Sequence, residues 1–460
     1  MSDTIDTLKK KVRGRVVTVA DADYDEARAV YNGMHDRRPL AIAQCADAAD
    51  VMAVIAAGRD SGLDVAVRGG GHSVPGFGTI DDGLVIELSK MSYVQVDPLK
   101  KVAQVGGGAT WGDVDHATYP FCLAAPGGII STTGVGGLTL GGGIGYLSRS
   151  VGLTIDNLLS ADVVLADGRQ VTASDYQNED LFWALRGGGG NFGVVTNFEF
   201  QLTEVGDVVG GPIFFEASDA KAVLQNYRDY IARAPESLGC FFGWQIAPEL
   251  PFIPEERHGD LLCVLVTCWN GPHEEADQVL KPLRDASKVV GEQVGVIPFP
   301  VMNSMFDAAV PKGMQNYWKA DFITELTDEA IDLHCEHGMK TPHISSSMHL
   351  HPINGAVQRV GADETAFGHR DKNFAPVIAG IWDDPADNEA NIQWVRDYYD
   401  AVHPHSGTDG GYVNFMSGDD DNRAPANYGA SYERLAAVKA VYDPDNLFHV
   451  NQNIAPASAS

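Results

Sequence analysis

The sequence predicts an α+β protein built from three stretches of different character. Residues 1–204 hold the clustered glycines, set between short apolar runs that are typical of strands. Residues 205–410 carry alternating strand and helix signals with few clustered glycines. From residue 411 the pattern changes again. We therefore expect a glycine-rich domain at 1–204, a second domain at 205–410 and a C-terminal segment at 411–460.

The elements of the first stretch follow from local patterns. Residues 1–36 are charged and are expected to be helical. Residues 46–61 repeat apolar side chains at helical spacing and stop before Gly62, which predicts a helix. Residues 159–172 predict a hairpin with an Asp-Gly turn. Strands are expected in LDVAVRG, LVIELS, VAQVGGG and VVTNFEFQLT, and helices in ATWGDVDHATY and NEDLFWALRG.

In the second stretch, strand-like and helix-like runs alternate. The expected strands are GPIFFEA, LLCVLVTCW, ISSSMHLHPI and PVIAGIW, and the expected helices are AKAVLQNYRDYIARA, HEEADQVLKPLRDAS and NEANIQWVRDYYDAVHP. The alternation predicts a mixed sheet covered by helices. In the last stretch, YVNF is expected to be a strand and SYERLAAVKAVYDPDN a helix.

The charge of the chain excludes some classes of partner. Acidic residues outnumber basic ones 62 to 33, which gives a formal net charge of -29. Such a field repels nucleic acid and anionic membranes, so we expect neither as a partner. The N-terminal segment MSDTIDTLKKKVRG lacks the apolar core of a signal peptide, and no run of about 18 apolar residues occurs. We expect a cytoplasmic protein with a small-molecule partner.

No metal site is expected. The six cysteines are scattered and form no CxxC pair, so a zinc site has little support. His349 and His351, in the run MHLHP, are a conceivable metal pair, but no third ligand is evident.

Glycines gather in four blocks: RGGGHSVPGFG (68–78), GGG (106–108), GGIISTTGVGGLTLGGGIG (127–145) and RGGGGNFG (186–193). Glycine lets the backbone approach a ligand closely, and converging backbone N–H groups can bind phosphate without charged side chains. The blocks therefore predict a cradle for a phosphate-bearing ligand. His72 lies in the first block, and from spacing alone it could equally be an ordinary hydrogen-bonded loop residue.

The motif GxGxxG occurs once, at Gly188, Gly190 and Gly193. It follows an expected helix and precedes an expected strand. A dinucleotide-binding Rossmann turn requires the opposite order, from strand to helix. This motif therefore argues against a nicotinamide-dependent dehydrogenase.

The glycine blocks, together with YVNF and NYGASYERLAAVKAVYDPDNLFHVNQNI, resemble the berberine-bridge-enzyme-like branch of the FAD-linked oxidases, in the vanillyl-alcohol-oxidase fold group. The resemblance runs from about residue 37 to residue 455 in the family's order. It implies an α+β fold with a PCMH-type FAD-binding domain of two subdomains, at about 37–204. An α/β substrate domain would follow, with an antiparallel sheet covered by helices. The C-terminal segment would then return to the FAD domain.

The resemblance also implies that FAD is bound covalently through His72, by a bond to the 8α carbon of the flavin. Some members add a second bond from a Cys two places before the TxG segment, and Ile130 stands at that position. An alkyl side chain cannot form this bond, so attachment through His72 only is expected. Doubly attached members tend to have open sites for large sugars, which makes that substrate class less favoured here.

Other cofactor contacts are implied by position in the family motifs. The pyrophosphate is expected beside 68–73 and 131–137, the adenine near Val195, and the flavin near the remaining residues of the set. The implied cofactor-binding residues are Arg68, Gly69, Gly70, Gly71, His72, Ser73, Ser131, Thr132, Gly134, Gly136, Gly137, Gly141, Gly142, Gly145, Asp156, Asn157, Val195, Tyr412, Asn414, Asn451 and Asn453.

The catalytic base departs from the family pattern. Some relatives place a Glu on the strand that matches GAVQRV, and Arg359 takes its place here. A guanidinium stays protonated and cannot be a base, but it could lower the pKa of a nearby Tyr or bind an anionic substrate. Tyr412 is then the first candidate base. Tyr317, His349 and His351 come second, each with a purely structural alternative as a residue of a sheet.

These features predict an FAD-dependent oxidoreductase that takes hydride from an alcohol-type substrate, either a sugar or a secondary-metabolite alcohol, or from a CH–NH group. Gly128 would leave room for O2 beside the flavin, which favours an oxidase. Two alternatives stay open. One is a dehydrogenase with another electron acceptor, and the other is a flavin-bearing binding protein without turnover.

Overall fold

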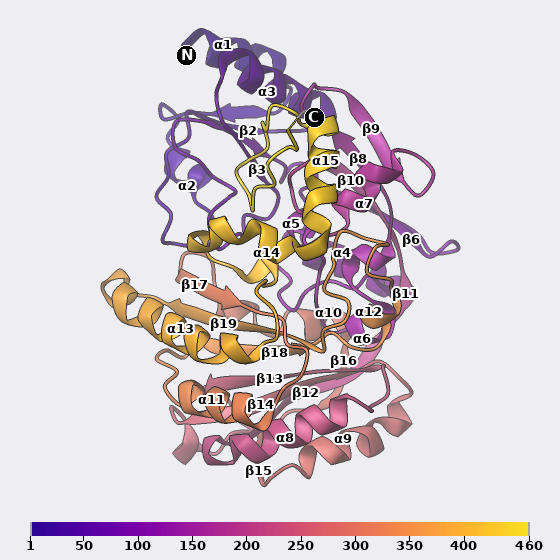
Figure 1. The fold of residues 1–460 in the computed structure, drawn as a ribbon, viewed down its shortest axis with the longest axis vertical. Helices are drawn as coiled ribbons and strands as arrows, with labels where there is room; N and C mark the ends of the chain where they lie inside the picture. The colour runs from indigo at the N-terminus through magenta and orange to yellow at the C-terminus, as the bar shows by residue number, and fades with distance from the viewer. Residues whose placement is uncertain (1, 459–460) are drawn as a thin grey trace.

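The computed structural model describes residues 2–458 (Figure 1). Residue 1 and residues 459–460, at the outer ends of the first and last expected segments, lie outside this range. The N-terminal domain occupies one end of an elongated molecule and residues 205–410 the other. The C-terminal helix α15 runs back onto the N-terminal domain, as Figure 1 shows in yellow against indigo and magenta.

The first subdomain is a four-stranded sheet in the order β1-β2-β4-β3, with β2, β4 and β3 parallel. Its elements are α1 (Ser2–Lys11), β1 (Arg15–Val17), α2 (Tyr24–Arg28), β2 (Ala41–Gln44), α3 (Ala48–Ser61), β3 (Val65–Arg68) and β4 (Leu84–Glu87). Helix α3 is confirmed, and it ends at Gly62 in the left-handed conformation. The expectation of a helical 1–36 is wrong in part, because the buried Val16 and Val17 pair with β2 as an edge strand.

The second subdomain is a five-stranded antiparallel sheet in the order β5-β6-β10-β8-β9. Its strands are β5 (Val94–Asp97), β6 (Val102–Gly106), β8 (Leu158–Val164), β9 (Gln170–Ser174) and β10 (Val194–Gln201), with a small pair of β7 (Leu123–Ala124) and β11 (Thr203–Glu204). Its helices are α4 (Trp111–Thr118), α5 (Val135–Leu140), α6 (Ser148–Val151) and α7 (Glu179–Leu185). The expected hairpin is confirmed, closed by the Leu165 N–H, which donates to the Arg169 carbonyl.

Residues 205–410 form a large sheet in the order β15-β12-β14-β13-β18-β19-β17, with β16 also paired to β12. Its strands are β12 (Asp207–Glu216), β13 (Leu238–Ile246), β14 (Leu261–Trp269), β15 (Val289–Glu292), β16 (Gly295–Pro298), β17 (Gln315–Ala320), β18 (Ser347–Pro352) and β19 (Phe374–Trp382). Each pairing in it is antiparallel, as the family resemblance implied and unlike the mixed sheet inferred from the alternation.

The two faces of this sheet have different neighbours. Helices α8 (Ala220–Ile231), α9 (Ala276–Arg284), α11 (Asp328–Gly338) and α13 (Asn388–Val402) cover one face (Figure 1). Met348 and Leu350 of β18 point into that apolar layer. Because side chains alternate along a strand, His349 and His351 project from the opposite face. There they meet Phe241, which packs with Tyr146 of the N-terminal domain.

The C-terminal segment contains α14 (Ala424–Tyr428) and α15 (Tyr432–Tyr442), and the short helices α10 (Phe299–Asn303) and α12 (Ala356–Arg359) lie earlier in the chain. The expectation of a strand at YVNF is wrong. Val413–Phe415 is one turn of 3-10 helix, held locally by the Phe415 N–H, which donates to the Tyr412 carbonyl. The expected helix is confirmed as α15, and it packs on α7 through Leu435.

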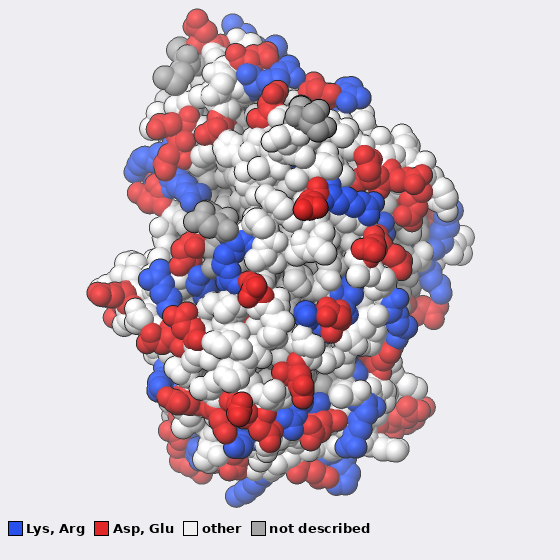
Figure 2. All heavy atoms as spheres, in the orientation of Figure 1, with Lys and Arg blue, Asp and Glu red and all other residues white. Residues whose placement is uncertain are grey.

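Acidic side chains are spread over the face shown in Figure 2, with basic ones between them, rather than gathered in one patch. Within residues 2–458, no helix is both long and apolar enough to cross a bilayer. The same range brings no three His, Cys, Asp or Glu side chains together in an arrangement that could hold a metal ion.

A buried ion pair fixes the C-terminal segment to the N-terminal domain. Lys439 and Asp443 are both 0% exposed, and their charged atoms lie 2.6 Å apart. Lys439 also donates to the carbonyls of Asn191 and Phe448. Asp443 accepts from the N–H groups of Leu447 and Phe448.

We expect Asp443→Ala to lower the free energy of unfolding by about 3 to 5 kcal/mol, because it leaves a buried ammonium without its counter-ion. Urea unfolding followed by tryptophan fluorescence measures the change. The exposed neighbour Asp445 supplies the control, and Asp445→Ala should have little effect. Equal stability of the two variants would contradict this role for the pair.

Candidate active site

Two glycine loops of the N-terminal domain touch each other through their backbones. A Cβ on Gly70, after β3, would lie 2.4 Å from the Gly134 nitrogen, so only glycine allows the contact. Beyond it, Gly136 is half-buried and Gly137 is exposed, and no atom lies within 4 Å of a Cβ position on Gly137. The backbone beside this contact is open, and the phosphate site expected there stays a prediction.

The Arg68 side chain packs against the first glycine loop, residues 68–78. Its side-chain carbons lie 3.3 to 3.8 Å from Cβ positions on Gly71 and Gly78. Its guanidinium pairs with the buried Glu87 and donates to the Ala27 carbonyl. The Nη1 atom is buried without a partner in the described chain. The side chain therefore shapes the loop and keeps one N–H donor for a ligand.

His72 is held as a neutral imidazole. Its ring stacks on the Tyr31 ring, with centroids 4.0 Å apart and planes 19° apart. The Thr133 hydroxyl lies 3.4 Å from His72 Nδ1. Burial, and then the charge of Lys312, lower the pKa of His72 to about 4. A neutral imidazole keeps the lone pair that a covalent bond to carbon needs.

Ser131 is a correction to the expected phosphate contacts. Its N–H and its hydroxyl both donate to the Asp307 carboxylate, at 2.9 Å and 2.5 Å. A residue whose two donors already serve a carboxylate has none left for phosphate. The Ser73 hydroxyl oxygen accepts from the Phe77 N–H, and its O–H can still donate to a phosphate. Thr132, which is exposed, remains available beside the loop contact.

Tyr412 fixes the glycine turn at 141–145. Its hydroxyl oxygen accepts from the Gly143 N–H at 2.8 Å and from the Asn414 amide at 2.9 Å. Burial raises the pKa of Tyr412 to about 12, although these donors oppose the rise. Gly141 must lack a side chain, because a Cβ there would lie 2.2 Å from Asn414 Oδ1, and Gly145 packs as closely on the Gly127 carbonyl.

Asp156 and Asn157 lie behind the glycine turn, and protein groups use their polar atoms. Both Asp156 oxygens accept from the Arg370 guanidinium, at 2.7 and 2.8 Å. The Asn157 amide donates to the carbonyls of Val151 and Leu153. The Ile155 N–H donates to the Gly142 carbonyl, so this segment stabilises the turn at 141–145. Asp156 and Asn157 therefore act on the turn at 141–145 through the protein.

The C-terminal asparagines lie along the fourth glycine block. Asn451 donates to the Gly190 carbonyl, and a Cβ on Gly190 would meet no atom within 4 Å. The Oδ1 atoms of Asn451 and Asn453 are buried without partners in the described chain. Buried polar atoms are normally paired, so these orphans fit a bound polar ligand such as FAD. Val195 is buried in β10, and its carbonyl faces Gly107.

Small side chains surround His349 on the sheet face opposite the helices. The strand register places His349 between Gly243 of β13 and Val377 of β19, with Ala320 of β17 next in the row. We call this row, with His351, the floor. Burial lowers the pKa of His349 to about 4, so the imidazole is neutral near pH 7. The floor thus offers two neutral imidazoles, because burial also lowers the pKa of His351.

Aromatic rings frame the floor. Phe241 lies 5.1 Å from His349 between ring centroids, and Phe306 lies 6.5 Å away. Phe415 lies 5.9 Å from His351. Phe415 also meets the Tyr412 ring edge-on at 4.8 Å, so it joins the floor to the glycine turn.

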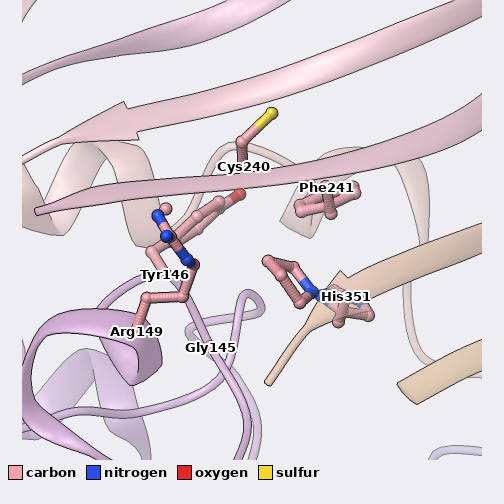
Figure 3. Close-up of a pocket in the computed structure, with 8 residues that line it drawn as sticks. Gly145, Tyr146, Arg149, Cys240, Phe241 and His351 are labelled. Carbon is pink, nitrogen blue, oxygen red and sulfur yellow. The ribbon is translucent and has the colours of Figure 1, made fainter. Parts of the chain in front are cut away.

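A small cavity lies beside the floor, lined by residues of both domains. Figure 3 shows His351 and Phe241 on one side and Tyr146 and Arg149 on the other. Tyr146 Oη and His351 Nε2 are buried without partners in the described chain. Arg149 donates to carbonyls at the end of α8, among them that of Ile231, and so ties the two domains together.

Arg359 is a second correction. The expected strand at GAVQRV is the short helix α12, and the Arg359 side chain is 59% exposed and paired with Glu236 at 2.5 Å. It does not reach the floor or Tyr412, so it cannot lower the pKa of that phenol.

Tyr317 is also misplaced as a base. It belongs to the apolar layer under the helices, on the face opposite His349. Its hydroxyl donates to Asp419 and accepts from Arg396, and burial followed by the Asp419 contact raises its pKa. The purely structural alternative is confirmed for this residue.

The chain matches two family models, one described as FAD binding domain over residues 39–174 and one as Berberine and berberine like over residues 411–455. An uncharacterized FAD-linked oxidoreductase of Bacillus subtilis, YgaK, is 32% identical over 98% of this chain and 99% of its own. The chain belongs to the berberine-bridge-enzyme-like FAD-linked oxidoreductases. FAD is therefore the cofactor that the glycine cradle fits, and the PCMH-type fold is confirmed.

Other relatives of this FAD-linked oxidoreductase are named as oxidases. (R)-6-hydroxynicotine oxidase of Paenarthrobacter nicotinovorans is 30% identical over 97% of both chains. The solved structure of 6-hydroxy-D-nicotine oxidase from Arthrobacter nicotinovorans has a TM-score of 0.86 and 28% identity, covering 97% of this chain and 98% of that chain. An Acremonium strictum glucooligosaccharide oxidase has a TM-score of 0.87 and 25% identity, covering 99% of both.

Four residues of the site were missed in the sequence: Tyr31, Phe241, Phe306 and Phe415. Phe415 carries a usable signal, since it follows Tyr412 in the motif YVNF. The other three lie in segments with no motif, and only the strand register and the loop contacts bring them to the site.

We expect Gly134→Ala to lower the amount of flavin that this oxidoreductase binds. The new Cβ would lie 2.3 Å from the Gly70 nitrogen and force the loops apart. The ratio of flavin to protein absorbance measures the loss. Gly295→Ala in β16 is the matched control, since no atom lies within 4 Å of its Cβ position. Full flavin content in Gly134→Ala would show that the loop contact does not shape the cradle.

Proposed function

We propose that this protein is an FAD-dependent oxidase that takes hydride from an alcohol-type substrate, with FAD attached covalently through His72 alone. The observation that carries the proposal is the contact of Phe415 with both Tyr412 and His351. Through it, the turn that would hold the flavin faces the floor that would hold the substrate. FAD, when bound, supplies the hydride acceptor.

His349 is the proposed proton acceptor. The shifted pKa values support this choice: near pH 7 the Tyr412 phenol keeps its proton, whereas the His349 imidazole is neutral and has one unprotonated nitrogen. A neutral imidazole can take the hydroxyl proton of an alcohol as its C–H bond breaks. Tyr412 would then be a positioning residue for the turn at 141–145, and it stays the second candidate base.

The shape of the floor supports an apolar secondary-metabolite alcohol rather than a large sugar. Gly243, Val377 and Ala320 leave a flat surface, and aromatic rings frame it. Such a surface binds flat apolar groups by burial, with few hydrogen-bond partners for sugar hydroxyls. Ile130, in place of a second attachment Cys, agrees with this preference.

A dehydrogenase that uses another electron acceptor is the second candidate function, and one observation favours it. The space beside Gly128 is not open, because a Cβ there would lie 2.8 Å from Leu138 Cδ1. The proposal of an oxidase therefore rests on the oxidase relatives and not on room at Gly128.

The attachment of FAD is tested by precipitating the full chain with acid and recording the spectrum of the washed pellet. We expect a yellow pellet from the wild type and a colourless one from His72→Ala. The variant keeps the glycine loops that would bind FAD without a covalent bond. His116→Gln, at an exposed position, is the control for changing a histidine. A colourless wild-type pellet with free FAD in the supernatant would refute the covalent bond.

We expect His349→Gln to slow anaerobic flavin reduction by an aryl or other apolar alcohol by about 10² to 10⁴-fold at pH 7, the usual range for loss of a general base. Stopped-flow absorbance measures the rate. Tyr412→Phe should have the smaller effect on this step, and the reverse ranking would make Tyr412 the base. Admitting air to the reduced wild type then separates the two functions, since slow reoxidation indicates a dehydrogenase.

A further inference from the structure

Tyr31 lies directly over the proposed attachment residue. Its ring is nearly parallel to the His72 imidazole, with 4.0 Å between centroids. Its N–H donates to the carbonyl of Gly71, the residue before His72, at 3.0 Å. The phenol is therefore tied to the loop that it covers, and any rotation of the imidazole must work against the stack.

The substrate domain holds the other side of Tyr31. The Tyr31 hydroxyl donates to the Val310 carbonyl at 2.6 Å, and the Tyr31 carbonyl accepts from the Gly313 N–H at 2.9 Å. Burial, and then the charge of Asp307, raise the pKa of Tyr31 to about 12, so the hydroxyl keeps the proton that it donates. The ring is thus fixed at both ends by backbone contacts.

The imidazole itself has much weaker restraints. The backbone of Thr132 approaches the ring, and the Thr133 hydroxyl lies at the long distance of 3.4 Å from Nδ1. A contact of that length fixes direction poorly. The stacked Tyr31 ring is the contact that restrains the plane of the imidazole.

We infer that Tyr31 is a positioning residue that orients His72 for covalent attachment of FAD, and that the segment 310–313 of the substrate domain locks Tyr31 in place. The inference rests on the proposed attachment through His72. The new bond joins an imidazole nitrogen to the 8α carbon and replaces one N–H and one C–H bond. Both hydrogens, with their two electrons, pass to dioxygen, which becomes hydrogen peroxide.

Orientation matters for such a bond because the nitrogen lone pair must point at the carbon. A displacement of about 1 Å in a reacting group can cost about a hundredfold in rate. Since two backbone contacts of Tyr31 come from the substrate domain, attachment should be efficient only when the two domains are docked. The positive charge of Lys312 acts in the same direction by disfavouring a protonated His72.

The test adds FAD to full-length protein produced in riboflavin-limited cells and follows denaturation-resistant flavin with time. We expect Tyr31→Leu to slow attachment by about tenfold to a hundredfold at saturating FAD. Tyr31→Phe keeps the stacked ring and loses the Val310 bond, and it should stay within about threefold of the wild type. Intact-protein mass gives a second measure of the attached fraction.

Two further readouts separate orientation from general damage. The dissociation constant for FAD, measured at early times by flavin fluorescence, and the Tm should change little in Tyr31→Leu. A wild-type attachment rate in Tyr31→Leu, or a slowing fully explained by weaker FAD binding, would overturn the inference. If the wild type itself forms no covalent bond, the proposed attachment fails instead, and His72→Ala would then match the wild type.

Discussion

The touching backbones of Gly70 and Gly134 are the contact on which the rest of the site depends. One glycine follows the parallel sheet of the first subdomain and the other precedes α5 in the second, so the contact joins the two halves of the FAD-binding domain. Any side chain would separate them. The same approach leaves Gly136 and Gly137 as bare backbone beside the junction, where FAD phosphates fit, and it brings His72 next to Thr133.

The large sheet works as a two-sided element. On one face, aromatic and aliphatic side chains pack against the helices and form a buried apolar layer. The other face keeps small residues around His349 and leaves the closing of the site to rings from loops and from the C-terminal segment. A shift of β18 by one residue would exchange His349 for Leu350 and remove the polar group from the site.

Much of this arrangement could be predicted from the sequence, and the errors have physical causes. Local signals predicted β14 and α3 correctly, because they depend only on neighbouring residues. These signals are the β-branched run of β14 and the Gly62 stop of α3. Strand β13 was overlooked because glycines interrupt it, and Gly239 is needed there only because the Tyr146 carbonyl would lie 2.1 Å from its Cβ. Arg359 and Ser131 were misjudged because their partners, Glu236 and Asp307, lie far away in the chain.

The return of the C-terminal segment has a consequence for the order of biogenesis. Asn451 meets the loop at 188–191, and Lys439 fixes that loop from α15, so late-synthesised residues form a wall of a site whose opposite wall is made early. Before residues 411–458 fold back onto the N-terminal domain, this wall is missing. Cofactor loading is therefore expected to wait for that docking step, which leaves a window in which an open apoprotein depends on the cellular supply of flavin.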